Sequence, residues 1–390
     1  MIFSFLLCGF LIAKFWQDTI ILSINHLAQY TKLTQAVIKQ SLFLSPVGLT
    51  IGSMIVGPLN DRFGPKKTFP VYLGIISILN IMFLYPCNAT IFKIALFLRS
   101  LCLAGAINNV YVGISLMFKG DALPKATSIL YMSLFGFGTI FPIAFLFFVK
   151  ALSFKSLVLL NLILCLVVSV FLYIKLPEKN PIFINLKTFK TWLDFIVNPK
   201  FLACSAVSMV CIGGFYGILS LYKSEFATLP EETLKVETTI TIYITLGIIQ
   251  AIGRGMTFLT ATFCSFQLNT SNVNRYLAIS NFMLFIGFLS MFISGLVLNK
   301  LILVGSFGFF LACLASGIAQ PSTKLNLLNI FKSSAGSGQS LVGVANSIFE
   351  VVGMIFIFNM PYQPVCSYLY LLMIALINFT LCMYFRRLNR

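Results

Sequence analysis

Long apolar runs separated by short polar segments dominate the sequence. Each run has about 20 residues, which is the length that a helix needs to cross a bilayer core of roughly 30 Å. Because a span must satisfy its own backbone polar groups in lipid, runs of this length predict helices, and we expect an all-α membrane protein with twelve transmembrane helices. The runs are Phe3–Ser23, Ser41–Leu59, Thr68–Pro86, Phe92–Phe118, Ala126–Val149, Ser156–Leu176, Phe201–Tyr222, Thr238–Phe263, Tyr276–Leu298, Leu301–Pro321, Ser340–Met360 and Ser367–Phe385.

The longest polar segment divides these runs into six and six. It contains Pro177, Pro181, Pro199 and several lysines. We therefore predict that residues 1–176 form an N-terminal six-helix half, that 177–200 form a cytoplasmic central loop, and that 201–390 form a C-terminal six-helix half. Two pseudo-symmetric halves are typical of secondary transporters, which bind substrate between them near the middle of the membrane.

The composition agrees with this organisation. Of the 390 residues, 59% are hydrophobic and 9% are charged, and the mean hydropathy is +0.97. Since a soluble domain carries about 25% charged residues, we expect an integral, multi-pass membrane protein. The formal net charge is +17, but most Lys and Arg lie in short loops on one side of the predicted helices. That bias predicts cytoplasmic termini rather than a nucleic-acid partner.

Enzyme and metal chemistry have little support in the sequence. The chain has one histidine, His26, so a histidine-rich metal site is excluded. The segment Gly336–Gly338 is glycine-rich, but it lacks the lysine and the preceding strand of a phosphate-binding loop. We expect neither an enzyme nor a cofactor or metal site.

One polar segment, between the second and third runs, has a distinctive pattern. It is too short for anything but a tight hairpin between antiparallel spans. A generic basic loop explains its cations but not its two glycines and its acid. It resembles the loop signature of the major facilitator superfamily, G-x-x-x-D-R-x-G-[RP]-[KR]-[KR], with matches at Gly57, Asp61, Arg62, Gly64, Lys66 and Lys67.

This resemblance implies the major facilitator fold and a conformational latch. In that family the acid lies against the eleventh helix when the outside is open, and here that acid is Asp61. The eleventh run begins near Ser340, where a helix N-terminus offers free N–H groups and partial positive charge. Arg62 is expected to hold Asp61 in place.

Ionisable residues inside the spans form a second set of candidates. Each costs about 2.5–3.5 kcal/mol or more in a bilayer, so such residues usually face a cavity and have a function. An acid in this setting can load and unload protons, and a buried arginine needs an acid or several carbonyls nearby. The alternatives are an intrahelical pair between Lys14 and Asp18, and a purely structural role for Arg99. The residues are Lys14, Asp18, Arg99, Arg254 and Glu350.

The resemblance extends to the drug/proton antiporters of the superfamily. Their fourth helix carries R-x-x-x-x-x-G, matched by Arg99 and Gly105, and their first helix carries an acid, matched by Asp18. The chain is most similar to the Bcr/CflA-type antiporters, since Ala335–Gly343 resembles their A-G-x-A-S-x-L-x-G segment. The resemblance implies proton coupling through Asp18 and Arg99 in a bacterial inner (plasma) membrane. Glu350 is a further candidate for proton coupling, and a structural pair with Arg254 is its alternative.

The sequence also departs from that family. The fifth-helix antiporter signature ends in G-P-x-x-G-G, whereas Phe141–Leu146 keeps the proline and loses the glycines. The prolines that follow the first-helix acid in the relatives are replaced by Leu22 and Asn25. These departures leave the direction of transport open.

We therefore predict a monomeric secondary transporter that works by alternating access, with a small-molecule substrate, protons and the lipid bilayer as its partners. Export of a small apolar or cationic compound such as a drug, in exchange for protons, is the preferred hypothesis. Proton-driven uptake of a small metabolite, such as an amino acid, is the alternative, and a non-transporting membrane sensor is the alternative from another class. Side chains expected to line the substrate cavity are Asp18, Arg99, Asn109, Phe215, Tyr216 and Phe309.

Overall fold

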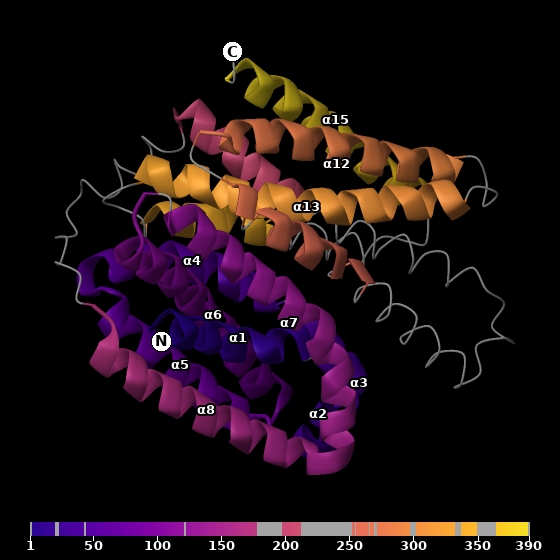
Figure 1. The fold of residues 1–390 in the computed structure, drawn as a ribbon. Coiled ribbons are helices and arrows are strands. Elements are labelled where there is room, and N and C mark those ends of the chain that lie inside the picture. The colour runs from indigo at the N-terminus through magenta and orange to yellow at the C-terminus, as the bar shows by residue number, and fades with distance from the viewer. Residues whose placement is uncertain are drawn as a thin grey trace, which may run out of the picture. The chain divides into compact units, whose positions relative to one another are not determined.

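The computed structural model describes residues 2–19, 23–42, 44–120, 122–177, 197–211, 252–253, 255–264, 266–268, 271–296, 302–331, 337–348 and 364–388. Within these ranges the chain is helical and contains no strand (Figure 1), which agrees with the predicted fold class. The helices are α1 (Ile2–Thr19), α2 (Ile24–Thr31), α3 (Gln35–Ser41), α4 (Leu44–Phe63), α5 (Pro65–Met82), α6 (Ala89–Met117), α7 (Ala122–Leu152), α8 (Phe154–Lys175), α12 (Val273–Leu296), α13 (Ile302–Phe331) and α15 (Pro364–Arg387). Residues 199–211, 255–264 and 337–348 are helical as well.

The chain forms two compact units. The first contains residues 1–123, 140–198 and 327–348, and the second contains 124–139, 199–326 and 349–390. Each unit thus includes a segment from the other half of the sequence, the start of α7 in one case and residues 327–348 in the other. The predicted boundaries at 176 and 201 describe the sequence halves, and they stay a prediction.

The segment predicted to be a hairpin between the second and third spans is almost entirely helical. α4 continues through Asp61 to Phe63, and α5 begins at Pro65, so Gly64 alone separates them. Polar residues end the apolar run here but not the helix, because the backbone ladder continues to the Gly64 N–H, which donates to the Asn60 carbonyl at 3.0 Å. Gly64 has φ 76°, a conformation that residues with a Cβ rarely adopt. The sharp reversal therefore depends on this glycine.

Close backbone packing joins α4 to α6. A Cβ on Gly48 would lie 2.5 Å from the Phe97 carbonyl oxygen, and one on Gly52 would lie 2.6 Å from that of Leu101. Two small residues four apart let helix backbones approach in this way, as is common in membrane proteins. The Oγ atoms of Ser45 and Ser100 form a hydrogen bond of 2.8 Å at the same interface.

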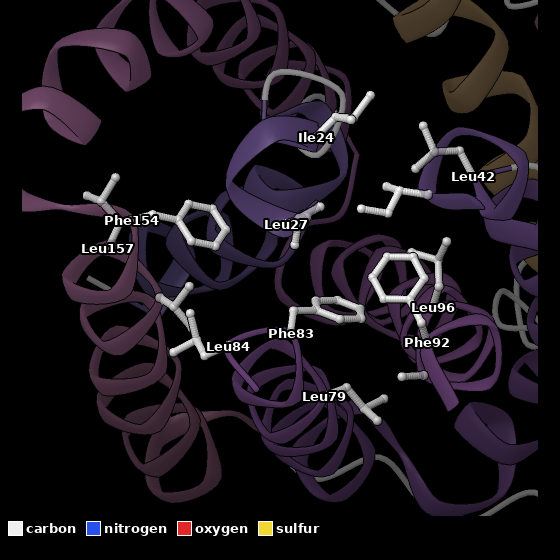
Figure 2. Packing of buried hydrophobic residues seen from close by; sticks show 13 residues of the cluster. Ile24, Leu27, Leu42, Leu79, Phe83, Leu84, Phe92, Leu96, Phe154 and Leu157 are labelled. Carbon is white, nitrogen blue, oxygen red and sulfur yellow. The ribbon is translucent and has the colours of Figure 1, made fainter. Parts of the chain in front are cut away.

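A hydrophobic cluster lies where α5 ends and α6 begins. Side chains from the ends of these helices, such as Phe83 and Phe92, meet Leu27 of α2 and Phe154 of α8 (Figure 2). The Phe83 and Phe92 rings lie 5.2 Å apart, and the ring of His26 stacks on Phe154 at 5.4 Å. Fully burying such a side chain contributes about 1.5–3 kcal/mol, so the cluster stabilises α2 and α3, which are too short to appear as apolar runs.

The outer faces of the helices are apolar. Ile78 of α5 and Ile174 of α8 are each 61% exposed, and Val71 and Ile163 are exposed as well. Among the described helices, α6, α8 and residues 273–294 of α12 are long and apolar enough to cross a membrane. These exposed faces are suited to lipid contact.

In the second unit, α12 packs along α15 and contacts α13 closely. A Cβ on Gly308 would lie 2.5 Å from the Gly287 carbonyl oxygen, so these two glycines set the α12–α13 distance. The rings of Phe285 and Phe379 lie 5.2 Å apart between α12 and α15.

Candidate functional site

Asp61 is a buried acid at the end of α4. Its side chain is 5% exposed. Its Oδ2 accepts hydrogen bonds from the backbone N–H of Ser337 at 2.7 Å and from the Ser337 hydroxyl at 2.6 Å. A backbone N–H that donates to another helix is typical of a first helical turn, where N–H groups lack intrahelical partners. The sequence predicts Asp61 against this helix near Ser340, and in the structure its partner is Ser337, three residues earlier.

A second contact lies along the same pair of helices. A Cβ on Gly343 would lie 2.7 Å from the Ser53 Oγ and 3.2 Å from its Cβ. Since Ser53 precedes Asp61 by about two turns of α4, residues 337–348 lie along α4 rather than touching it at one point. Both contacts are inside the first compact unit.

The basic residues of the motif are less enclosed than its acid. Arg62 and Lys67 are exposed, and Lys66 is partly buried. The Arg62 guanidinium carbon lies 5.1 Å from the centroid of the neighbouring Phe63 ring. Gly57 is buried within α4, one turn before Asp61. The proposed part of Arg62 in holding Asp61 stays a prediction.

Buried amides lie next to this motif. The Asn60 side-chain amide donates to Asn108 Oδ1 at 3.0 Å, and the Thr68 hydroxyl contacts Asn109 Oδ1 at 3.0 Å. Asn109, predicted to line the substrate cavity, is fully buried at this point against the first turn of α5.

Arg99 is buried inside α6 and is 1% exposed. Its Nε donates to Asn80 Oδ1 of α5 at 2.8 Å. Asn80 Nδ2 donates in turn to Asn161 Oδ1 of α8 at 3.3 Å, and Asn161 Nδ2 donates to the Ile12 carbonyl of α1 at 3.4 Å. A continuous chain of hydrogen bonds therefore joins α6, α5, α8 and α1.

Gly105, the glycine of the same fourth-helix motif, has a packing role. A Cβ at this position would lie 2.5 Å from the Cδ2 and Cε2 atoms of the Tyr72 ring. Only a residue without a side chain fits beneath that ring. The pattern R-x-x-x-x-x-G thus combines a buried cation with a close contact between α6 and α5.

The remaining predicted residues are only partly described. Asp18 belongs to α1, which ends at Thr19, and its side chain lies outside the described residues. Phe309 is buried in α13, and its ring lies 5.6 Å from that of Phe310, edge to face. A Cβ on Gly253 would lie 2.8 Å from Phe309 Cζ, so this ring packs within the second unit. Four predicted residues lie outside the described part of the chain: Phe215, Tyr216, Arg254 and Glu350.

Neither asparagine of the hydrogen-bonded chain was predicted from the sequence as a site residue. Asn80 lies in a predicted span, as does Asn161, but neither is ionisable, so a search for charges in apolar runs passes over them. The sequence feature that could have identified them is an amide side chain within an otherwise apolar run. Such amides commonly bond between membrane helices.

Comparisons with known proteins agree on the fold. Residues 5–356 match the family model described as Major Facilitator Superfamily. No curated protein sequence matches the chain. The human organic anion transporter MFSD10 (TETRAN) has a similar solved structure, with a TM-score of 0.71 and 12% identity over 98% of each chain.

Two further solved structures are similar over nearly their full length. The proton:xylose symporter XylE, bound to 6-bromo-6-deoxy-D-glucose, has a TM-score of 0.70 and 14% identity, over 100% of this chain and 95% of that one. A bacterial homologue of the iron transporter ferroportin, in an outward-facing state with soaked iron, has a TM-score of 0.71 and 13% identity, over 99% of each chain. At these identities the likeness shows the fold, and the twelve-helix architecture is consistent with it.

Proposed function

We propose that this chain, which belongs to the major facilitator superfamily, exports a small apolar or cationic compound in exchange for protons. Membership makes it a multi-pass membrane protein and a secondary transporter of a small molecule. The finer proposal is a function like that of the Bcr/CflA-type drug/proton antiporters. One observation carries it: Arg99, which cannot lose its charge, is 1% exposed within α6.

The proposed coupling uses Asp18 and Arg99. While the site is empty, charged Asp18 is held by Arg99, because leaving either charge buried and unpaired is costly. Protonation of Asp18 frees Arg99, and a cationic substrate then competes with the proton for the same carboxylate. Exchange follows from this competition, since both cannot be bound strongly at once.

The contact between Asp61 and Ser337 supports the latch part of the proposal. We propose that this contact holds the cytoplasmic ends of the sequence halves together and breaks once in each transport cycle. The Ser337 N–H and hydroxyl bonds to the carboxylate, at 2.7 and 2.6 Å, are charge-assisted and thus stronger than neutral ones.

Proton-driven uptake is the second candidate. It is kept open by the loss of the three signature glycines within Phe141–Leu146. The two functions differ in the direction of proton movement relative to the substrate. That direction can be measured.

The test uses purified protein in proteoliposomes loaded with ethidium, tetraphenylphosphonium or an amino acid mixture, together with a lumenal pH dye and a clamped membrane potential. Efflux of a loaded probe should acidify the lumen if protons move the opposite way, and should make it alkaline if they move together. A lumen whose pH does not respond to any loaded compound would favour the sensor hypothesis.

Within the same assay, Asp18→Asn should abolish the lumenal pH change while leaving some downhill probe movement. The control is Lys14→Ala, which should change little unless a local pair with Asp18 is what matters. If Asp18→Asn still couples probe to protons, Asp18 does not carry the proton, and Glu350 is the next residue to substitute.

The proposal also includes a monomer in a bacterial plasma membrane with both termini in the cytoplasm. Lys67 lies in the first turn of α5 and Tyr85 lies three residues after its last residue, Met82, and both are exposed. Single cysteines at these positions, with the native cysteines removed, should react with an impermeant thiol reagent from opposite sides of the membrane. Reaction of both from the outside would refute the orientation.

A further inference from the structure

We infer that Asn80 and Asn161 are positioning residues, which orient the Arg99 guanidinium and connect it to the backbone of α1. The inference rests on the proposed proton coupling and extends it to two residues that touch neither proton nor substrate. It is carried by the chain of hydrogen bonds from Arg99 to Asn80, Asn161 and the Ile12 carbonyl.

Arg99 fixes which atom donates and which accepts in each of these hydrogen bonds. An arginine side chain has donors and no acceptor, so Asn80 has to present its oxygen to Arg99. Its Nδ2 then faces Asn161, which has to present an oxygen in turn. With its oxygen facing Asn80, Asn161 has its Nδ2 as a donor, and this Nδ2 donates to the Ile12 carbonyl. Arg99 thereby determines the orientation of both amides.

The neutrality of the amides matters as much as their geometry. Asn80 holds Arg99 Nε at 2.8 Å without cancelling its charge. A carboxylate in the same place would form an ion pair with Arg99 and compete with Asp18. An amide orients the guanidinium and leaves its charge available to the proton-carrying acid.

The far end of the chain lies on the helix that carries Asp18. Ile12 precedes Asp18 by six residues, which is about 9 Å along a helix. A displacement of α1 relative to α8 would lengthen the bond from Asn161, which is already 3.4 Å, and would loosen Asn80 next. The guanidinium of Arg99 is therefore mechanically linked to α1 in addition to any electrostatic attraction.

The test compares Asn80→Ala, Asn161→Ala and Asn80→Asp with the parent in the ethidium-loaded proteoliposomes. The matched control is Asn281→Ala, which removes a similarly buried amide of α12 whose bond, among the residues that the structure describes, lies within its own helix, to the Leu277 carbonyl at 2.7 Å. The readouts are the pH profile of the lumenal pH change and the downhill ethidium flux, each normalised to folded protein.

Asn80→Ala should reduce the proton-coupled rate by about tenfold and alter its pH profile, because a hydrogen bond to a charged group is lost. Downhill ethidium flux should change less than the coupled rate. Asn161→Ala should act in the same direction by about threefold, since a neutral bond is weaker. Asn80→Asp should lose coupling most completely, although it retains an acceptor for Arg99. Asn281→Ala should resemble the parent.

Two results would overturn parts of this picture, and they differ. If the parent couples protons and Asn80→Ala behaves like Asn281→Ala, the amides are only structural and the inference is wrong. If the parent shows no proton movement, the proposed function fails and the coupling role of the amides fails with it. Thermal unfolding of Arg99→Met, Asn161→Ala and their combination then decides the positioning itself: additive effects refute it, and non-additive effects retain it.

Discussion

Asp61 and Arg99 are both buried charges, and the protein satisfies them in opposite ways. Asp61 bonds to the N–H and hydroxyl of Ser337, which lies 276 residues away in the sequence. Arg99 bonds to Asn80, only 19 residues away, and through it to two more of the first helices. One charge thus has partners from the other half of the sequence, and the other has partners from its own half.

The two kinds of contact are expected to behave differently during transport. In secondary transporters one half moves against the other during alternating access, so the proposed latch between the sequence halves would have to break and re-form. A bond within a half can persist through the cycle. On the proposed function, Asp61 is therefore suited to report which conformation the protein occupies, and Arg99 to keep its partners in every conformation.

The largest expected effect is that of Arg99→Met. Losing the buried charge should reduce proton-coupled transport by roughly tenfold or more, because hydrogen bonds to charged groups contribute about 1.5–3 kcal/mol. The melting temperature should fall, since Arg99→Met leaves the buried Asn80 oxygen without its donor and, on the proposed coupling, leaves Asp18 without its partner. Coupled flux and thermal unfolding of the same preparation measure both.

Arg99→Lys sharpens this result. Lysine keeps the charge but lacks the planar fork that Asn80 orients, so coupling should fall between that of the parent and of Arg99→Met. Parent-like coupling in Arg99→Met would mean that Arg99 only joins neighbouring helices.

Asp61→Asn should have the next largest effect, on conformation rather than on coupling. The amide keeps the size of the side chain but loses the charge that strengthens both bonds to Ser337. The population with this contact broken should rise by about tenfold, the equivalent of roughly 1.4 kcal/mol. The measurement is the alkylation rate of a single cysteine at Ser340, which is buried in the parent.

Arg62→Gln is the matched control for that variant. It removes the adjacent charge from an exposed side chain, and the alkylation rate should barely change. An unaltered rate in Asp61→Asn would refute the latch, and an equal increase in Arg62→Gln would assign the effect to the general charge of the loop.

In the part of the chain that the structure describes, apolar runs predicted the long helices well, because lipid permits few alternatives for an unbroken run; parts of the runs Phe201–Tyr222, Thr238–Phe263 and Ser340–Met360 lie outside that part. They placed the ends of α4 and α5 less well, since Asp61 and Arg62 are too polar for the bilayer and yet remain helical. α2 and α3 could not be predicted this way, because they are stabilised by tertiary contacts such as that of Leu27 with its cluster.

The candidate site was predictable where charge carries the signal. The cost of an isolated charge in an apolar run singled out Arg99, and the resemblance to the superfamily signature placed Asp61 against the helix near Ser340; the roles of both residues stay predictions. Asn80 and Asn161 give no such signal. An amide costs little enough in a span that only its hydrogen-bond partners reveal its role.

Gly343→Ala should open the contact between Asp61 and Ser337 by steric means. The alkylation rate at position 340 should rise by about fivefold, less than in Asp61→Asn, which corresponds to the lower end of the roughly 1–3 kcal/mol that overpacking costs. The new Cβ would lie 2.7 Å from Ser53 Oγ. Ser53→Gly in the same chain should remove the clash and restore the parent alkylation rate at position 340. Gly74→Ala is the control, since a Cβ there meets nothing within 4 Å.

The smallest effect should come from Ser337→Ala, which divides the contact into its two bonds. The hydroxyl bond of 2.6 Å is lost, while the backbone N–H bond of 2.7 Å to the same Asp61 oxygen remains. Alkylation at position 340 should therefore rise by only about threefold, within the range expected when one of two hydrogen bonds is removed.

Combining Ser337→Ala with Asp61→Asn tests whether both act on one contact. If the hydroxyl stabilises the protein only through the Asp61 charge, the second substitution should add little to the first. Ser337→Thr keeps a hydroxyl and should behave like the parent if its methyl group fits. Equal effects of Ser337→Ala and Asp61→Asn would show that the hydroxyl alone carries the contact, and the backbone N–H at the helix start would then contribute nothing to the latch.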